Sequence, residues 1–219
     1  MSSFPNSPRL LKAGLVLVDP ASGALKAAIV LQYNPDSLSR TLQVQAHGAD
    51  NRDRSEALRV KGPPVETIKL EVEIDATDQL EFPQQHPNAV ALGIQPQLAT
   101  LETILYPTSR DLLANDALAG RGTLEIVPME SPLALFVWSK NRVVPVRVTD
   151  FSVTEEAFDP TLNPIRAKVS LGLRVLSIDD LGFAHRGGSL FISYLQNKEA
   201  LAGKAPAGGL SAFGLQGLP

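Results

Sequence analysis

The sequence contains no cysteine, and only 5% of its 219 residues are aromatic. Without cysteine the chain can form neither disulfides nor thiolate sites. Its histidines, His47, His86 and His185, lie in expected loops, and none has a second histidine at the spacing of metal ligands. We therefore interpret them as surface residues, and we expect no metal, no cofactor and no catalytic centre.

An excess of basic charge is also missing, because the formal net charge is -3 and the pI is about 5.6. Proteins that bind nucleic acid or anionic membranes usually present a basic surface. No apolar run is long enough to span a bilayer, and residues 1–10 lack the charged and apolar regions of a signal peptide. We expect no nucleic-acid partner, no membrane insertion, and a chain that is made and assembled in the cytoplasm.

What the sequence does contain is two segments with the two-residue period of a half-buried strand. They lie within residues 65–78 and residues 165–175, where apolar side chains occupy alternate positions. The outer face of the first segment is mostly acidic and consists of Lys69, Glu71, Glu73 and Asp75. The outer face of the second segment is basic and includes Arg166, Lys168 and Arg174.

These outer faces allow several interpretations. Carboxylates such as Glu71 and Glu73 can act as acid and base or hold a hard cation, but on a regular strand they more often form the solvated face. If the two strands are neighbours in a sheet, their opposite charges pair within one subunit. If the strands lie on different flanks, the same charges join one subunit to the next.

A turn with the sequence FDPTLNP, from Phe158 to Pro164, precedes the basic strand. Proline presets φ, and Asp159 and Asn163 tolerate unusual backbone angles. We expect this turn to fix the register of the strand.

The remaining sequence also predicts mainly strands. They are expected over residues 11–18, 25–33, 37–47, 123–127, 133–138 and 143–151, the last continuing toward residue 156. Leu42 and Val44 are expected to face inward, and Phe136 and Trp138 share a face that suits a core or a buried interface anchor. Loops are expected over residues 47–59 and 109–122, and a short turn over residues 139–141.

Helical spacing occurs twice. It predicts a helix over residues 88–105 with Ile94, Leu98, Leu101 and Leu105 on one face, although Pro96 offers an alternative first turn. A short second helix would be capped by Ser189, with Leu190, Phe191, Tyr194 and Leu195 sharing a face. The class is therefore mainly β with one or two helices, a β-rich α+β fold.

The C-terminal tail, from residue 203 onward, is rich in Gly, Ala and Pro but also carries Leu210, Phe213, Leu215 and Leu218. A linker does not need such apolar side chains, so the tail either docks on a partner or is disordered. We divide the chain into a β domain over residues 1–186 and a C-terminal helix and tail over residues 187–219.

Several motifs, in this order, resemble the N-terminal domain of contractile injection system tube proteins, the tube-initiator and inner baseplate proteins of phage-tail-like particles. They are YNP (Tyr33, Asn34, Pro35), GPPVETIKLEVEIDATD, LATLETILYP, PLALFVW and FDPTLNPIRAKVSLGL. The resemblance covers residues 11–177.

The resemblance implies a tail-tube-like β-barrel or sandwich with a packed helix, arranged six to a ring. Such a homo-hexameric ring would join the spike hub and baseplate to the inner tube and initiate tube assembly. Its partners would be the inner tube protein, the hub protein and other baseplate or sheath-initiator proteins. Tyr33, Asn34, Pro35, Trp138, the turn, the charged strand faces, Leu210 and Phe213 are then candidate interface or structural residues.

The chain departs from the family pattern in places. Ser139 and Asn163 stand where the family often has glycine, and the sequence has no downstream LysM domain, so no LysM function is carried over. Two alternatives stay open: the repeating inner-tube subunit itself, and a non-catalytic soluble β-sandwich that binds a sugar or peptide.

Overall fold

The computed structural model describes residues 10–45, 59–120, 131–206 and 208–217. The strand expected over residues 123–127 lies outside the described residues, as do His47, Leu218 and nearly all of the loop expected over residues 47–59.

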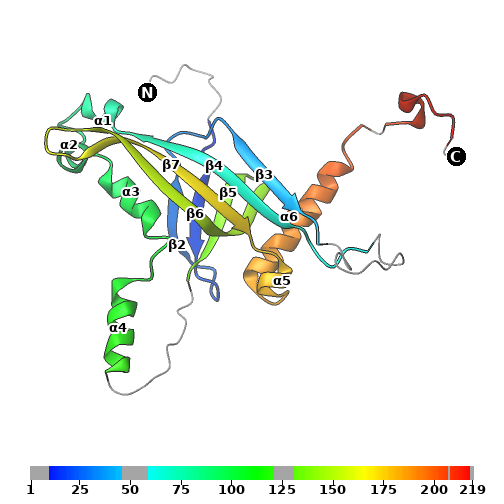
Figure 1. Cartoon of the computed structure of the whole chain (residues 1–219), viewed down its shortest axis with the longest axis horizontal. Coiled ribbons are helices and arrows are strands. Elements are labelled where there is room, and N and C mark those ends of the chain that lie inside the picture. Colours follow the sequence, from blue (N-terminus) through cyan, green and yellow to red (C-terminus); the bar gives the residue numbers. More distant parts are fainter. Residues whose placement is uncertain (1–9, 46–58, 121–130, 207, 218–219) are drawn as a thin grey trace.

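The described strands form one antiparallel sheet with the order β2-β1-β5-β6-β7-β4-β3 (Figure 1). The strands are β1 (Gly14–Val18), β2 (Leu25–Val30), β3 (Leu38–Gln43), β4 (Val65–Asp75), β5 (Leu133–Ser139), β6 (Arg142–Phe158) and β7 (Pro164–Val175). The helices are α1 (Thr77–Leu80), α2 (Pro87–Leu92), α3 (Gln95–Glu102), α4 (Ser109–Ala119), α5 (Ile178–Leu181) and α6 (Arg186–Ala202), followed by a 3-10 turn, η2 (Leu210–Phe213).

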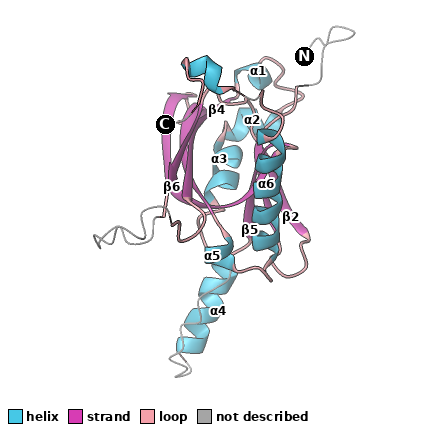
Figure 2. Ribbon diagram, turned by 90° about the vertical axis from the view of Figure 1, so that its right-hand side faces the viewer, coloured by secondary structure: helices cyan, strands magenta, loops and turns pink. Residues whose placement is uncertain are grey.

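The mainly β class is confirmed, with more helices than the sequence predicts. Its strands form a single curled sheet instead of two stacked ones, and α3 lies between the two parts of the curl (Figure 2). At Gln32, just after β2, one end of the curled sheet comes next to the end of β4. Its side chain donates to Asp75 O (2.6 Å) and accepts from Asp75 N (3.0 Å).

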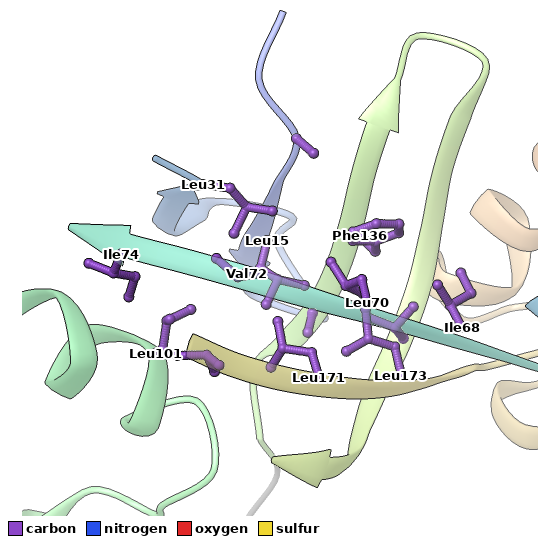
Figure 3. Close-up of a cluster of buried hydrophobic side chains, with 14 of the residues drawn as sticks. Leu15, Leu31, Ile68, Leu70, Val72, Ile74, Leu101, Phe136, Leu171 and Leu173 are labelled. Atoms are coloured by element: carbon purple, nitrogen blue, oxygen red, sulfur yellow. The ribbon is translucent and has the colours of Figure 1, made fainter. Parts of the chain in front are cut away.

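One apolar core fills the curl (Figure 3). It combines side chains from β1, β4, β5 and β7 with others from α3 and α6, including Leu15, Ile68, Phe136, Leu173, Leu101 and Phe191. The predicted inner faces of β4 and β7 are confirmed, because Ile68, Val169 and Leu173 are each 0% exposed. Full burial of such a side chain contributes about 1.5 to 3 kcal/mol, so these alternating faces are a main source of stability.

The inward placement of Leu42 and Val44 is wrong. Leu42 is 46% exposed and Val44 is 65% exposed. Leu42 lies on the edge strand β3, opposite Glu66 of β4. On β4 the apolar core cluster ends at Ile68, so Leu42 lies beyond it. Val44 lies after the end of β3.

The single helix expected over residues 88–105 is broken into α2 and α3. Gly93 has a φ of +57°, and a Cβ there would meet Pro164 O at 2.1 Å, so the chain turns where only glycine fits. Pro96 lies in the first turn of α3, as the alternative start allowed. Ile94, Leu98 and Leu101 are buried as expected, but Leu105 follows the helix and is 41% exposed.

Two further expectations are wrong. Most of the loop expected over residues 109–122 is helix α4, with Thr108 as N-cap. α4 buries none of its residues, and its apolar side chains are not gathered on one face, so the sequence shows no clear helical period there. Ser189 does not cap the last helix, since α6 begins at Arg186 and His185 Nδ1 accepts from Gly187 N (3.0 Å).

Helix α6 is long and packs against β6 and the core through Phe191 and Tyr194. The boundary drawn at residue 186 therefore precedes a helix that completes the core of the β domain. None of the described helices is long and apolar enough to cross a membrane.

Candidate interaction surface

The charged outer faces of β4 and β7 lie side by side. The two strands are antiparallel neighbours, with Asp75 opposite Arg166 and Glu73 opposite Lys168. Arg166 Nη2 lies 2.7 Å from Asp75 Oδ2. Of the two arrangements that the sequence left open, the pairing of charges within one subunit is therefore the one found.

Neighbouring elements complete this charged face. Lys168 Nζ lies 3.2 Å from Glu156 Oε1 of β6, and Arg174 Nη2 lies 2.7 Å from Asp180 Oδ1 of α5. The hydrogen bond to Glu156 and the charge of that carboxylate raise the pKa of Lys168 above its ordinary value. Lys168 therefore stays charged at neutral pH, and the face is a mixed surface with both signs interspersed.

Asp75 lies at the end of this face. Its partial burial raises its pKa, but hydrogen bonds from Thr77 and Arg166 lower the pKa by more, and the net pKa lies below the ordinary value. Asp75 Oδ1 also accepts from Thr77 N (2.7 Å), at the start of α1. The carboxylate therefore joins β4, β7 and the first helix.

The turn before β7 is organised by Asp159. Its Oδ1 accepts from Thr161 N (2.7 Å) and Asn163 N (2.9 Å), and its Oδ2 accepts from Asn163 Nδ2 (2.8 Å). The hydrogen bonds from Asn163 are the main cause that lowers the Asp159 pKa to about 2. Within this turn Leu162 has the left-handed backbone, with a φ of 69°, whereas Asn163 does not.

Asn163 instead connects the turn to the helices, because its Nδ2 donates to Ala91 O (3.1 Å). Pro164 O, next in the chain, accepts from Ile94 N (2.8 Å). Phe158, at the end of β6, is 50% exposed. The turn therefore fixes both the register of β7 and the position of α3, while presenting one aromatic ring to the surface.

The YNP motif has a structural part and an exposed part. Asn34 Oδ1 accepts from Ala13 N (2.9 Å) and its Nδ2 donates to Leu11 O (2.8 Å), so it holds the segment before β1. Tyr33 is 43% exposed. Tyr33, Asn34 and Pro35 line one hollow with Glu71 and Glu73, so the structure brings these candidate residues together.

The aromatic and C-terminal candidates lie apart from this face. Trp138 is partly buried, with its ring centroid 6.0 Å from that of Phe136 at a tilt of 36°. It packs against the core, so the core interpretation fits. Leu210 is 41% exposed and Phe213 is 76% exposed, both in η2 beyond α6.

A buried cluster that the sequence did not lead us to expect surrounds Glu66. Glu66 is 3% exposed, and its carboxylate lies 2.6 Å from Arg40 Nη2 and 3.0 Å from Lys198 Nζ. Tyr194 donates its hydroxyl to Glu66 Oε1 (3.1 Å), and Lys198 Nζ lies 4.1 Å from the centre of the Tyr194 ring. The signal was present, because Glu66 shares its strand face with Ile68 and Leu70, and a charge on a core face requires partners.

The Glu66 cluster joins β3, β4 and α6. Burial raises the pKa of Glu66, but hydrogen bonds from Lys198 and Arg40 and their charges outweigh that effect, and the net pKa lies below the ordinary value. Glu66 is therefore ionised at neutral pH. The cluster fixes the C-terminal helix on the sheet and so determines where the tail leaves the body.

Among the described residues, no group of three or more His, Cys, Asp or Glu side chains is arranged to hold a metal ion. The residues brought together are instead arranged as surfaces: a mixed charged sheet face, exposed aromatic rings and a projecting helix. No model of a known protein family matches the chain, and no curated protein matches it.

Proposed function

We propose that the chain is a structural component of a contractile injection system. In this proposal it forms a ring that joins the spike hub and baseplate to the inner tube and initiates tube assembly. The proposal rests on the ordered motifs of residues 11–177 that resemble the tube domain. The observation that supports it best is the construction of the sheet.

The two end strands, β2 and β3, each pair on one side only within the described residues. A free sheet edge is a liability for a monomer, because it can pair with another chain. A closed ring of identical subunits covers such edges, since each subunit presents one surface to the next. An assembling role therefore gives these edges a function.

The strands of the charged face support the same role. β4, β6 and β7 contain 11, 17 and 12 residues, against about 5 to 6 in an ordinary strand. Long paired strands make a stiff element, and their mixed charges are already balanced within the subunit. Such a face suits a permanent structural role in an assembly better than a site that must bind and release a ligand.

Projecting apolar segments support contacts with unlike neighbours. Helix α4 projects away from the sheet (Figure 1). It buries none of its residues, and its Leu113 is 71% exposed. Phe158, the last residue of β6, is 50% exposed. Large exposed apolar side chains on a protein surface usually mark places where another protein binds.

The proposal is tested by capturing the tagged full-length chain from its producing cells, separating the extract by size, and identifying co-purifying proteins by mass spectrometry. We expect the chain in particle-sized fractions together with inner tube and hub proteins, and an unrelated cytosolic protein with the same tag to be absent from them. Elution near the monomer mass of 23.4 kDa, with neither protein, would contradict the proposal.

A further inference from the structure

A groove lies beside the outer edge of β2, between that strand, the end of β4 and helix α3. Its volume is about 220 Å³, and all the side chains that line it are uncharged, among them Ala28, Ile29, Ile74, Thr100 and Leu101. A groove of this size and chemistry suits one large apolar side chain, the usual anchor of a protein interface.

The groove also contains polar groups without partners. Gln97 lines it, and Gln97 Oε1 is buried with no hydrogen-bond donor in the described part of the chain. Buried acceptors are almost always satisfied in folded proteins. The edge of β2 that pairs with no other described strand adds backbone donors and acceptors at the rim. The groove therefore suits a peptide segment, which supplies backbone N–H and C=O groups as well as an apolar side chain.

The C-terminal tail provides a segment of matching chemistry, which we call the tail knob, Leu210–Phe213. In a 3-10 turn, side chains three residues apart eclipse, so Leu210 and Phe213 lie on one side. Backbone bonds from Ala212 N to Gly209 O (3.0 Å) and from Leu215 N to Leu210 O (3.1 Å) hold this turn. From residue 203 onward Lys204 is the only charged residue, so the knob is preformed, apolar and neutral.

We propose that the tail knob of one copy docks in the groove of a second copy of this chain. The end of α6 is fixed near the start of β4, where Lys198 contacts Glu66. The groove lies at Val72 and Ile74, about 20 to 26 Å further along the strand. In Figure 1 the tail leaves α6 in the direction away from β2. To reach the groove of its own copy, the tail would have to turn back and run along the length of β4.

Helix α4 is another segment with exposed apolar side chains, but it suits the groove less well. A helix is about 10 Å wide, too wide for a groove that takes a single large side chain. Arg110, Asp111 and Asp116 also place charges along α4, whereas the lining of the groove has none. The knob fits in both size and charge.

The proposed contact is head to tail, because the knob and the groove are different surfaces. A head-to-tail contact closes into a ring when its rotation allows and otherwise grows into a filament. The proposed contact adds detail to the proposed function. Only the statement that the copies close into a ring rests on that function. The contact itself can be tested with the purified protein alone.

The test compares two full-length variants with the wild type by analytical ultracentrifugation. Phe213→Ser removes the apolar side chain of the knob. Ala28→Trp, at an exposed position of β2, fills the groove. We expect the wild type to associate beyond the monomer, and each variant alone to associate at least about tenfold more weakly. Mixed in equal amounts, the variants should form a dimer of one copy each and nothing larger, because one retains the groove and the other the knob.

Circular dichroism checks that Ala28→Trp is folded, and Thr100→Arg, at an exposed groove position of α3, is a second way to block the groove. Leu113→Ser on α4 is the matched control and should associate like the wild type. A wild type that stays monomeric, or a mixture that yields no dimer, would overturn the inference.

The two proposals fail separately. If the chain is found in particles but the mixed variants form no dimer, the tail contact is wrong and the ring role stands. If the mixture forms dimers but the chain never co-purifies with tube and hub proteins, the contact stands and the assigned particle is wrong.

Discussion

The two faces of β4 carry carboxylates in contrasting surroundings. On the inner face Glu66 is 3% exposed and is held by Arg40, Lys198 and Tyr194. On the outer face Asp75, whose side chain is 14% exposed, pairs with Arg166, whose side chain is 44% exposed. An acid–base pair therefore contributes more to stability on the inner face than on the outer face. The reason is that the inner carboxylate is more deeply buried and its interactions are less screened by water.

The largest effect should come from Glu66→Gln. The change leaves two partly buried cations without their counter-charge, and we expect a loss of about 2 to 3 kcal/mol, below the full cost of breaking a buried pair because Lys198 is partly solvated. The measurement is urea denaturation at pH 7. Glu71→Gln, on the outer face of the same strand, is the matched control and should change stability by less than about 0.5 kcal/mol. Equal effects of the two changes would abolish the contrast between the faces.

The pH dependence sharpens the same contrast. The folded-state pKa of Glu66 lies below its ordinary value of 4.5, so its contribution to stability is present above pH 4.5 and is lost as the pH falls through the folded-state pKa. The stability difference between wild type and Glu66→Gln should therefore be constant near pH 7 and shrink in acid. A difference that grows in acid would show that Glu66 is stabilised in its protonated form.

An intermediate effect is expected for Asp159→Ala, which removes the acceptor that organises the turn before β7. The pKa of Asp159 is lowered from 3.8 to about 2, so its contribution holds above pH 3.8 and disappears as the pH falls toward 2. In urea denaturation at pH 7, the midpoint should fall by less than for Glu66→Gln. Hydrogen exchange should show faster opening of the β6–β7 turn, and unchanged protection there would contradict this role.

The smallest effect is expected for Lys168→Gln on the outer face. Exposed ion pairs contribute little to stability because water and salt screen them. The urea midpoint at pH 7 should match that of the wild type within error, at low and high salt alike. A clear loss of stability that salt abolishes would mean that the outer charges also hold the fold.

The contrast between the faces also explains what the sequence could predict. The faces of β4 and β7 were predictable because a strand buried on one side imposes a strict two-residue period. The acidic and basic outer residues were found in the same way. Whether they pair within the subunit depended on β4 and β7 being neighbours, and the local pattern of Glu73 or Lys168 contains no information on strand order.

The remaining errors have two physical causes: a helix without an apolar period, and contacts between residues far apart in the sequence. Helix α4 buries nothing, so its helical tendency left no periodic apolar signal. The break at Gly93 depends on the close approach of Pro164 O, a contact between residues far apart in the sequence. The partners of Glu66 come from β3 and α6, so only its position on an apolar face was visible beforehand.

The most direct test of the proposed role is to delete the gene for this chain in its producing cell and count sheathed particles by negative-stain electron microscopy. The account predicts that tubes are lost or are found detached from baseplates, and that the wild-type chain supplied in trans restores them. Intact particles in normal number would contradict the role of this chain in starting the tube.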